Sequence, residues 1–287
     1  MIGRSAKKAV TALLRLMFYN NGVFVPRWGE LRGLSFRILD NESVPLAFLA
    51  GAWERDHFRM IQHLREAGAI PQSKAIVCDI GAHIGFYTAW FDRFYKQDCV
   101  IYAFEPSPLV SGRLSDTVAL NRCAGVRIVP KAVADKEGST TFYLSDHNST
   151  GSIHPAGSEP RAVTVETIDL DGFFYGPERR EPPHFMKIDI EGGCTHAFPG
   201  ARRLFREAAP LVIMDSHNVK EDAAVGAMLS ELGWSAFRLD NGEWVTNMEA
   251  TAPVRNGVWG TMVLCSAEKK PLVQDAVNRM FHRVRAS

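Results

Sequence analysis

The chain has 287 residues, 46% of them hydrophobic and 23% charged, and its formal net charge is +1. This composition suits one globular domain with its own core, and the near-zero charge gives no reason to expect a nucleic-acid partner. Five cysteines without C-x-x-C spacing argue against a disulfide framework or a zinc site and favour a cytoplasmic location. Because no apolar run reaches the roughly 18 residues of a membrane span, no integral membrane segment is expected.

Residues 1–50 lack the strand–helix alternation found later and are predicted to be an N-terminal extension to a main domain at 51–287. Between Ala6 and Phe18, apolar residues recur at helical spacing. This pattern predicts a helix that packs on the domain or forms a homodimer contact, and membrane-surface binding is the alternative. Arg15 interrupts the apolar stretch, which argues against a signal peptide.

From about residue 70 onward, β-rich runs alternate with helical patterns, which is typical of a parallel sheet covered by helices on both faces. An amphipathic helix is expected before this part, at 54–67. Further helices are expected from the end of the first strand to about residue 95, after a cap at Ser107, and at 220–232. Exposed or hairpin strands are expected at 139–144 and 162–170. Buried strands are expected at 74–79, 99–104, 126–129, 185–190, 211–215, 235–239 and 258–265.

The first of these strands ends in an acid and a glycine-containing turn, Asp79-Ile80-Gly81-Ala82-His83-Ile84-Gly85. Glycines let the backbone turn tightly and approach a ligand, and the helix that follows offers unpaired N–H groups. A dinucleotide fingerprint needs glycines where His83 and Phe86 stand, so a nicotinamide-dependent oxidoreductase is the disfavoured alternative. An acid directly before the turn suits a cationic ligand, and S-adenosylmethionine carries a sulfonium and an ammonium group.

Glu105 ends the second strand in Phe-Glu-Pro. An acid at this point can accept hydrogen bonds from both ribose hydroxyls, as the equivalent acid does in dinucleotide sites. Together, the glycine turn and Glu105 predict a site for S-adenosylmethionine.

Several sequence blocks resemble the FkbM-type methyltransferase family over roughly residues 50–265. They are DIGAHIG at 79–85, VIYAFEPSP at 100–108, KAVADKEGSTTFY at 131–143, VETIDLD at 165–171, MKIDIEG at 186–192 and PGARRL at 199–204. The resemblance implies a Rossmann-like class I methyltransferase fold, a seven-stranded, mostly parallel sheet with helices on both faces. It also implies S-adenosylmethionine as the methyl donor and a hydroxyl of a saccharide or small natural product as the acceptor. Methylation of nitrogen or carbon on the same fold is the alternative.

The resemblance also assigns cofactor-binding residues. It places the turn residues Asp79, Gly81, Ala82, His83 and Gly85 around the methionine end of the cofactor and Glu105 on the ribose. Lys131 and Ala132 are expected near the adenine, and Ser152 belongs to a Ser/Gly-rich segment that resembles the active-site loop of the family.

Three positions depart from the usual pattern of the family. His83 stands where an asparagine is common, and Cys194 stands where an acid is common. The family commonly has Glu-x-His after the fifth strand. This chain has Asp215-Ser216-His217, so an aspartate stands in place of the glutamate.

Four side chains at the carboxyl ends of neighbouring strands are candidate catalytic residues: Asp189, Glu191, Asp215 and His217. A hydroxyl acceptor is a poor nucleophile while it is protonated, so a base must remove its proton. His217 has the ordinary pKa range for this role, and Asp189 is the second candidate. The same four groups can also collect a hard divalent ion such as Mg²⁺, but their spacing is not diagnostic, and no metal is expected.

Overall fold

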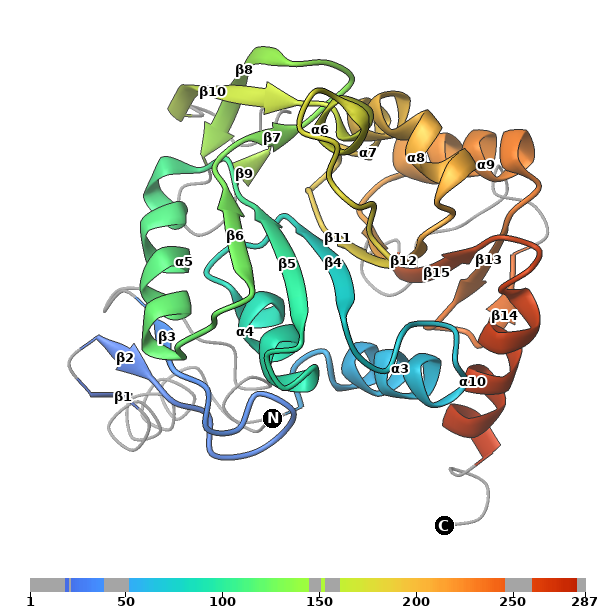
Figure 1. Ribbon diagram of the computed structural model, residues 1–287, viewed down its shortest axis with the longest axis horizontal. Coiled ribbons are helices and arrows are strands. Elements are labelled where there is room, and N and C mark those ends of the chain that lie inside the picture. The colour runs from blue at the N-terminus through green and yellow to red at the C-terminus, as the bar shows by residue number, and fades with distance from the viewer. Residues whose placement is uncertain are drawn as a thin grey trace, which may run out of the picture.

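The computed structural model describes residues 19–20, 22–38, 52–144, 151–152, 161–245 and 260–282. Its centre is an eight-stranded sheet with the order β14-β13-β15-β12-β11-β4-β5-β6 (Figure 1). The strands are β4 (Ala75–Ile80), β5 (Cys99–Phe104), β6 (Val126–Val129), β11 (Phe185–Ile188), β12 (Leu211–Ser216), β13 (Ser235–Arg238), β14 (Glu243–Trp244) and β15 (Gly260–Cys265).

The five strands from β12 to β6 in this sheet are mutually parallel, and β15 runs antiparallel to both of its neighbours. The prediction of a mostly parallel seven-stranded sheet is therefore confirmed, with the two-residue β14 added at one edge. Parallel strands have their carboxyl ends at the same edge of a sheet, so the residues that follow β4, β5, β11 and β12 share one rim.

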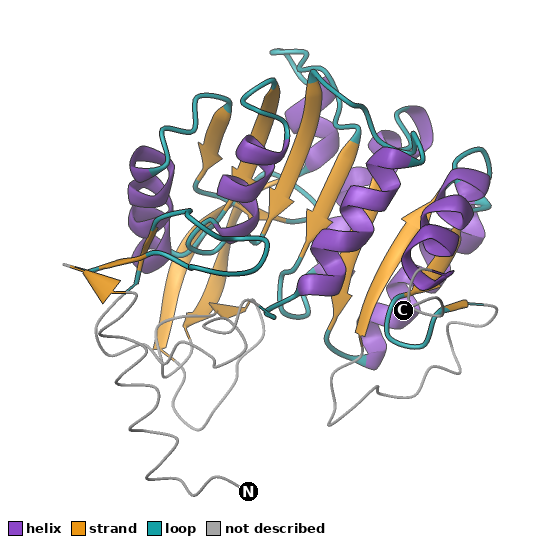
Figure 2. Cartoon of the chain, turned by 90° about the horizontal axis from the view of Figure 1, so that it is seen from below, coloured by secondary structure: helices purple, strands orange, loops and turns teal. Residues whose placement is uncertain are grey.

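Helices cover both faces of this sheet (Figures 1 and 2). One face packs against α3 (Arg55–Glu66), α4 (Phe86–Phe94), α5 (Pro108–Leu120) and α10 (Lys270–His282). The other packs against α6 (Leu170–Tyr175), α7 (Cys194–Ala197), α8 (Arg202–Glu207), α9 (Val219–Leu232) and the 3₁₀ helix η1 (Phe198–Ala201). Neighbouring residues of one strand are buried on opposite faces of the sheet, with Val77 in the first apolar cluster and Cys78 in the second. This two-sided burial explains why β4 is apolar along most of its length.

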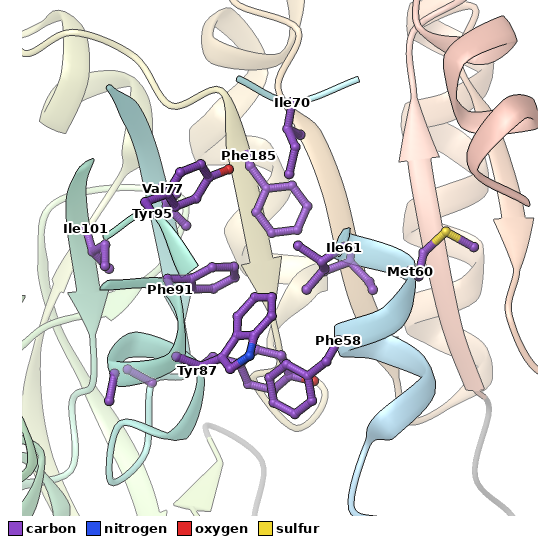
Figure 3. Packing of buried hydrophobic residues seen from close by; sticks show 14 of the residues in the cluster. Phe58, Met60, Ile61, Ile70, Val77, Tyr87, Phe91, Tyr95, Ile101 and Phe185 are labelled. Carbon is purple, nitrogen blue, oxygen red and sulfur yellow. The ribbon is translucent and has the colours of Figure 1, made fainter. Parts of the chain in front are cut away.

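Aromatic side chains join α3 to α4 on the first face (Figure 3). The rings of Phe58 and Tyr87 stack with centroids 4.7 Å apart, and Phe91 meets Phe185 of β11 edge-on at 5.7 Å. Such pairs contribute about 1 kcal/mol each beyond the burial of their area. The first pair fixes α3 against α4, the helix that begins at the glycine turn, and the second fixes α4 against β11.

A second, smaller sheet has the order β7-β10-β8-β9. It consists of β7 (Ala132–Val133), β8 (Gly138–Leu144), β9 (Gly151–Ser152) and β10 (Arg161–Ile168). The antiparallel pairing of β8 with β10 confirms the hairpin-type strands expected from their alternating pattern.

The N-terminal extension was predicted to be helical, and its described part is not. Residues 19–38 contain three short antiparallel strands, β1 (Tyr19–Asn20), β2 (Val23–Phe24) and β3 (Phe36–Arg37). The predicted helix between Ala6 and Phe18 lies outside the described residues. Phe24 and Phe36 are buried in the first core, so tertiary burial of alternate residues decides the structure of these strands.

Three further details differ from expectation. Ser107 is the N-cap residue of α5, but its side chain makes no capping hydrogen bond, because Pro108 fixes the start of the helix. The strand expected at 162–170 ends at Ile168, since Asp169 caps α6 by accepting from the N–H of Gly172. The helix α10 was not predicted. Within the described residues, no helix is both long and apolar enough to cross a membrane.

Candidate active site

The glycine turn connects β4 to α4 and is packed against two neighbouring strands. Gly81 has φ +80°, and a Cβ built there would lie 1.8 Å from the carbonyl oxygen of Asp189. The N–H groups of Gly81 and Ala82 donate to the carbonyl oxygen of Phe104 at 3.0 and 2.9 Å. Only glycine fits this position, because the backbone of the turn touches the chain that leaves β11.

His83 also adopts a left-handed backbone conformation, with φ 51°. Asn, Asp and His populate this region more readily than other non-glycine residues. A histidine in place of the expected asparagine therefore preserves the shape of the turn. The backbone N–H of His83 donates to Oε2 of Glu105 at 2.9 Å, which links the turn to the end of β5.

Glu105 is buried at the end of β5, with 6% of its surface exposed. Its Oε1 accepts from the N–H of Ser107 at 2.9 Å, so each carboxylate oxygen holds one backbone donor. A carboxylate oxygen has two acceptor positions, which leaves one on each oxygen for a ribose hydroxyl. Burial raises the pKa of Glu105 to about 7, although the two backbone N–H groups oppose this shift.

Asp79 lies beneath the turn, with 1% of its surface exposed. Its Oδ2 accepts from the hydroxyl of Thr88 at 2.5 Å. Burial raises the pKa of Asp79 to about 6, and the nearby ammonium of Lys187 limits the shift. Direct contact between Asp79 and a cofactor stays a prediction.

The residues expected near the adenine follow β6. Lys131 forms ion pairs with Glu166 at 3.1 Å and Glu137 at 3.5 Å, and Ala132 is buried at the start of β7. Ser152 is in β9, where its backbone lies opposite Tyr143 of β8. The cofactor contacts assigned to these three residues stay predictions.

Three of the four candidate catalytic residues converge at the end of β11 and β12. Nε2 of His217 lies 3.3 Å from Oδ1 of Asp189 and 3.6 Å from Oε2 of Glu191. One potential ligand atom from each of these residues lies within 4.8 Å of the others, so the group has the dimensions of a metal site as well as of an acid–base cluster. Asp215 lies outside this group and accepts from the hydroxyl of Thr261 at 2.7 Å.

Glu221 is a further member of the site that the sequence reasoning missed. It is fully buried at the start of α9, and its two oxygens accept from the N–H of His217 at 2.8 Å and the N–H of Cys194 at 3.2 Å. Oε2 of Glu221 also lies 3.4 Å from Nδ1 of His217. The sequence signal was Asn218-x-x-Glu221, which has the spacing of a capping box, although Glu221 accepts from the N–H of His217 instead of that of the N-cap Asn218.

Lys187 is the second missed residue, although a lysine inside the apolar strand β11 is conspicuous in the sequence. Its side chain is 4% exposed, and its Nζ lies 2.9 Å from Oδ2 of Asp189.

These neighbours decide which groups carry charge. Burial lowers the pKa of His217, but hydrogen bonds to Asp189 and Glu221 outweigh it and raise the value to about 11. Burial alone would raise the pKa of Asp189, whereas the charge of Lys187 and the contact with His217 hold it well below its usual range. Burial raises the pKa of Glu191. In the free protein, His217 is therefore an imidazolium paired with the Asp189 carboxylate at neutral pH.

Parallel strands that end in acids beside a glycine turn define a Rossmann-like domain of the kind that binds nucleotide cofactors. The family model for the methyltransferase FkbM domain matches residues 79–242, which is more than half of the chain. The chain therefore belongs to the FkbM methyltransferase family, and it is a methyltransferase. The sequence resemblance is confirmed.

Individual relatives are distant. Methyltransferase 1 from Beauveria bassiana (strain ARSEF 2860) is 22% identical over 189 residues, which cover 59% of this chain and 76% of that protein. A methyltransferase FkbM structure from Methylobacillus flagellatus KT has a TM-score of 0.46 and 16% identity, with 68% of this chain and 44% of that chain covered. An rRNA methylase from Streptococcus thermophilus has a TM-score of 0.45 and 12% identity, with 72% and 94% covered. This chain thus spans less than half of the Methylobacillus protein.

Proposed function

We propose that this protein is an S-adenosylmethionine-dependent O-methyltransferase that acts on a hydroxyl of a saccharide or a small natural product. The observation that carries the proposal is the contact between His217 and Asp189 at the rim beside the glycine turn. Membership of the FkbM family accounts for the transfer of a methyl group. An acid–base group next to the expected donor position supports a hydroxyl as the acceptor, because an alcohol must lose its proton during the transfer.

The residues at the rim fit the cofactor. Glu105 offers two carboxylate oxygens at the end of β5, and the glycine at position 81 lets the turn pack directly against the chain that leaves β11. The carboxylates Asp79, Asp189 and Glu191 favour a positively charged ligand over a pyrophosphate. When bound, S-adenosylmethionine supplies an electrophilic methyl group and a positive charge.

We assign the removal of the acceptor proton to the cluster of Asp189, Glu191 and His217. An imidazolium cannot accept a second proton, so His217 acts as the base only after it has lost the proton that its carboxylate neighbours stabilise. A positive charge placed at the rim favours this loss, because like charges repel. Asp189 then holds the imidazole in orientation, and Glu191 is the second group within reach of the proton.

The remaining parts of the proposal concern the setting of the enzyme. Asp215 supports the cluster from the neighbouring strand, and the reaction needs no metal, although Mg²⁺ fits the dimensions of the cluster. A cytoplasmic location and a homodimer contact through the N-terminal extension complete the proposal.

A methyl-transfer assay tests this function. Purified protein is incubated with S-adenosylmethionine labelled in the methyl group and a panel of hydroxylated glycans and natural products, with and without EDTA. Formation of a methyl ether, identified by mass spectrometry and unaffected by EDTA, supports the proposal. Methylation of amines or carbon acids alone would contradict the O-methyltransferase assignment. Activity that depends on added Mg²⁺ would contradict a reaction without a metal.

A further inference from the structure

We propose that Lys187 is a positioning residue for methyl transfer: its buried ammonium joins Asp189 to Asp215 and fixes Asp189 against His217. This inference rests on the proposed function, because it assigns Lys187 a role in the same acid–base cluster. Lys187 is a buried residue of β11, and it acts on the cluster through its contacts with Asp189 and Asp215.

Lys187 contacts the carboxylates of both Asp189 and Asp215, and it lies closer to Asp189. Its Nζ lies 2.9 Å from Oδ2 of Asp189 and 3.5 Å from Oδ2 of Asp215. The other oxygen of Asp189 faces Nε2 of His217 at 3.3 Å, and the other oxygen of Asp215 accepts from Thr261 at 2.7 Å. Each carboxylate therefore has a neighbour at both oxygens, although the contact of Asp189 Oδ1 with His217 is an ion pair outside hydrogen-bond geometry.

Lys187 also compensates negative charge where water does not reach. Two carboxylates that share a buried site repel each other, and one of them tends to take up a proton unless a cation lies between them. Burial lowers the pKa of Lys187, but the charges of Asp189 and Asp215, followed by those of Glu54 and Asp79, raise it above its usual range. Lys187 is consequently charged and keeps Asp189 ionised for its contact with the histidine.

A chain of side chains from α3 and α4 supports the other end of this arrangement. Nδ1 of His57 lies 2.9 Å from the hydroxyl of Tyr87, which donates to Glu54. Nε2 of His57 lies 2.7 Å from the hydroxyl of Thr261, which in turn donates to Asp215. The centroid of the Tyr87 ring lies 4.8 Å from Nζ of Lys187. Residues outside the matched family region thus help to hold the cluster.

The charged and titratable groups that face Lys187 come from every element around it. They are Glu54 at the N-cap of α3, His57 from α3, Tyr87 from α4, Asp79 from β4, Asp189 beyond β11 and Asp215 from β12. Acids predominate in this set, so removal of the single ammonium leaves uncompensated buried charge.

The test compares Lys187→Met with the double variant Lys187→Met/Asp215→Asn, with Lys220→Met on the exposed face of α9 as the control. The carboxyl pKa of Asp189 is measured by ¹³C NMR in the free protein. We expect it to rise into the titratable range in Lys187→Met and to fall again in the double variant, because one of the two repelling carboxylates is gone. An unchanged pKa in Lys187→Met, or no recovery in the double variant, would overturn the proposal.

Turnover gives the second readout. With any hydroxyl acceptor found above, Lys187→Met should lower kcat about 10²-fold, since misplacement of a reacting group has effects of this size. The KM for S-adenosylmethionine should stay within about threefold, and the double variant should recover part of kcat. If Lys187→Met does not fold, the double variant is compared with Asp215→Asn alone, and equal Asp189 pKa values would contradict the role of Lys187. Failure of the unmodified protein to bind S-adenosylhomocysteine would instead contradict the proposed function.

Discussion

The two halves of the rim are built in different ways. The proposed donor half, at the ends of β4 and β5, is built from short stretches of chain whose backbone groups bond to one another, as in the bonds from the N–H groups of Gly81 and Ala82 to the carbonyl oxygen of Phe104. The acceptor half, at the ends of β11 and β12, is an assembly of charged side chains from several elements around Lys187 and His217. A local motif can place a cofactor, whereas the base that acts on the acceptor depends on tertiary contacts.

The largest effect is expected from Gly81→Ala, because Gly81 lies where the glycine turn contacts the backbone of Asp189. The added Cβ would collide with the carbonyl oxygen of Asp189, and φ +80° is unfavourable for alanine. We expect the free energy of unfolding to fall by about 2 kcal/mol or more and S-adenosylhomocysteine binding to be lost. Urea denaturation and calorimetry measure both.

Gly68→Ala is the matched control, because Gly68 has φ +76° with open space around its Cβ position. Gly68→Ala has a similarly unfavourable positive φ to Gly81→Ala, but its Cβ collides with no neighbouring atom. Equal destabilisation of the two variants would show that the contact between the turn and Asp189 is not important.

The second prediction separates the halves. His217→Ala should lower kcat by about 10²-fold while the affinity for S-adenosylhomocysteine is unchanged, because a general base contributes to turnover and not to donor binding. His63→Ala is the control, since the polar contact of His63 within the described residues is with Glu66 of its own helix. Normal turnover of His217→Ala would transfer the base role to Asp189 or Glu191.

The third prediction concerns the donor half alone. Glu105→Ala or Asp79→Ala should weaken binding of S-adenosylhomocysteine at least tenfold, or about 1.4 kcal/mol, through loss of the ribose contacts or of the support beneath the turn. Calorimetry measures the affinity directly. Unchanged affinity in both variants would remove these acids from the site.

The smallest effect is a pH dependence of the donor half. The pKa of Glu105 is raised to about 7 in the free protein, so its carboxyl is protonated below that pH and must lose the proton to accept two ribose hydroxyls. The affinity for S-adenosylhomocysteine should therefore weaken as the pH falls from 7 to 6, by about fivefold. Glu105→Gln should bind with no such dependence in this window, and a slope that persists in this variant would assign the proton elsewhere.

Most of the fold and the presence of the glycine turn at the end of β4 could be predicted from the sequence, because local patterns determine them. Buried strands such as β4 are continuous apolar runs, and the glycine turn is one uninterrupted motif. The approach of His217 to Asp189 followed from the rule that parallel strands end at one rim. The separation of Asp215 from that pair could not be predicted in this way, because it results from the contacts of the Asp215 carboxylate with Lys187 and Thr261.

The protonation state of His217 could not be predicted either. Its ordinary pKa suggested a neutral base, whereas the carboxylates of Asp189 and Glu221 raise the pKa of His217 against the opposing effect of burial and so stabilise the imidazolium. That outcome depends on distances between α9 and β11, which no local sequence pattern specifies. The contact of His57 with Thr261 behind this cluster was missed for the same reason, since the two residues are 204 positions apart in the chain.

The most direct test of the central claim is isothermal titration calorimetry of the purified protein with S-adenosylhomocysteine and, separately, with NADH. We predict micromolar binding of S-adenosylhomocysteine and no binding of NADH. Binding of NADH without S-adenosylhomocysteine would contradict the assignment of the glycine turn and Glu105 to a methyl donor.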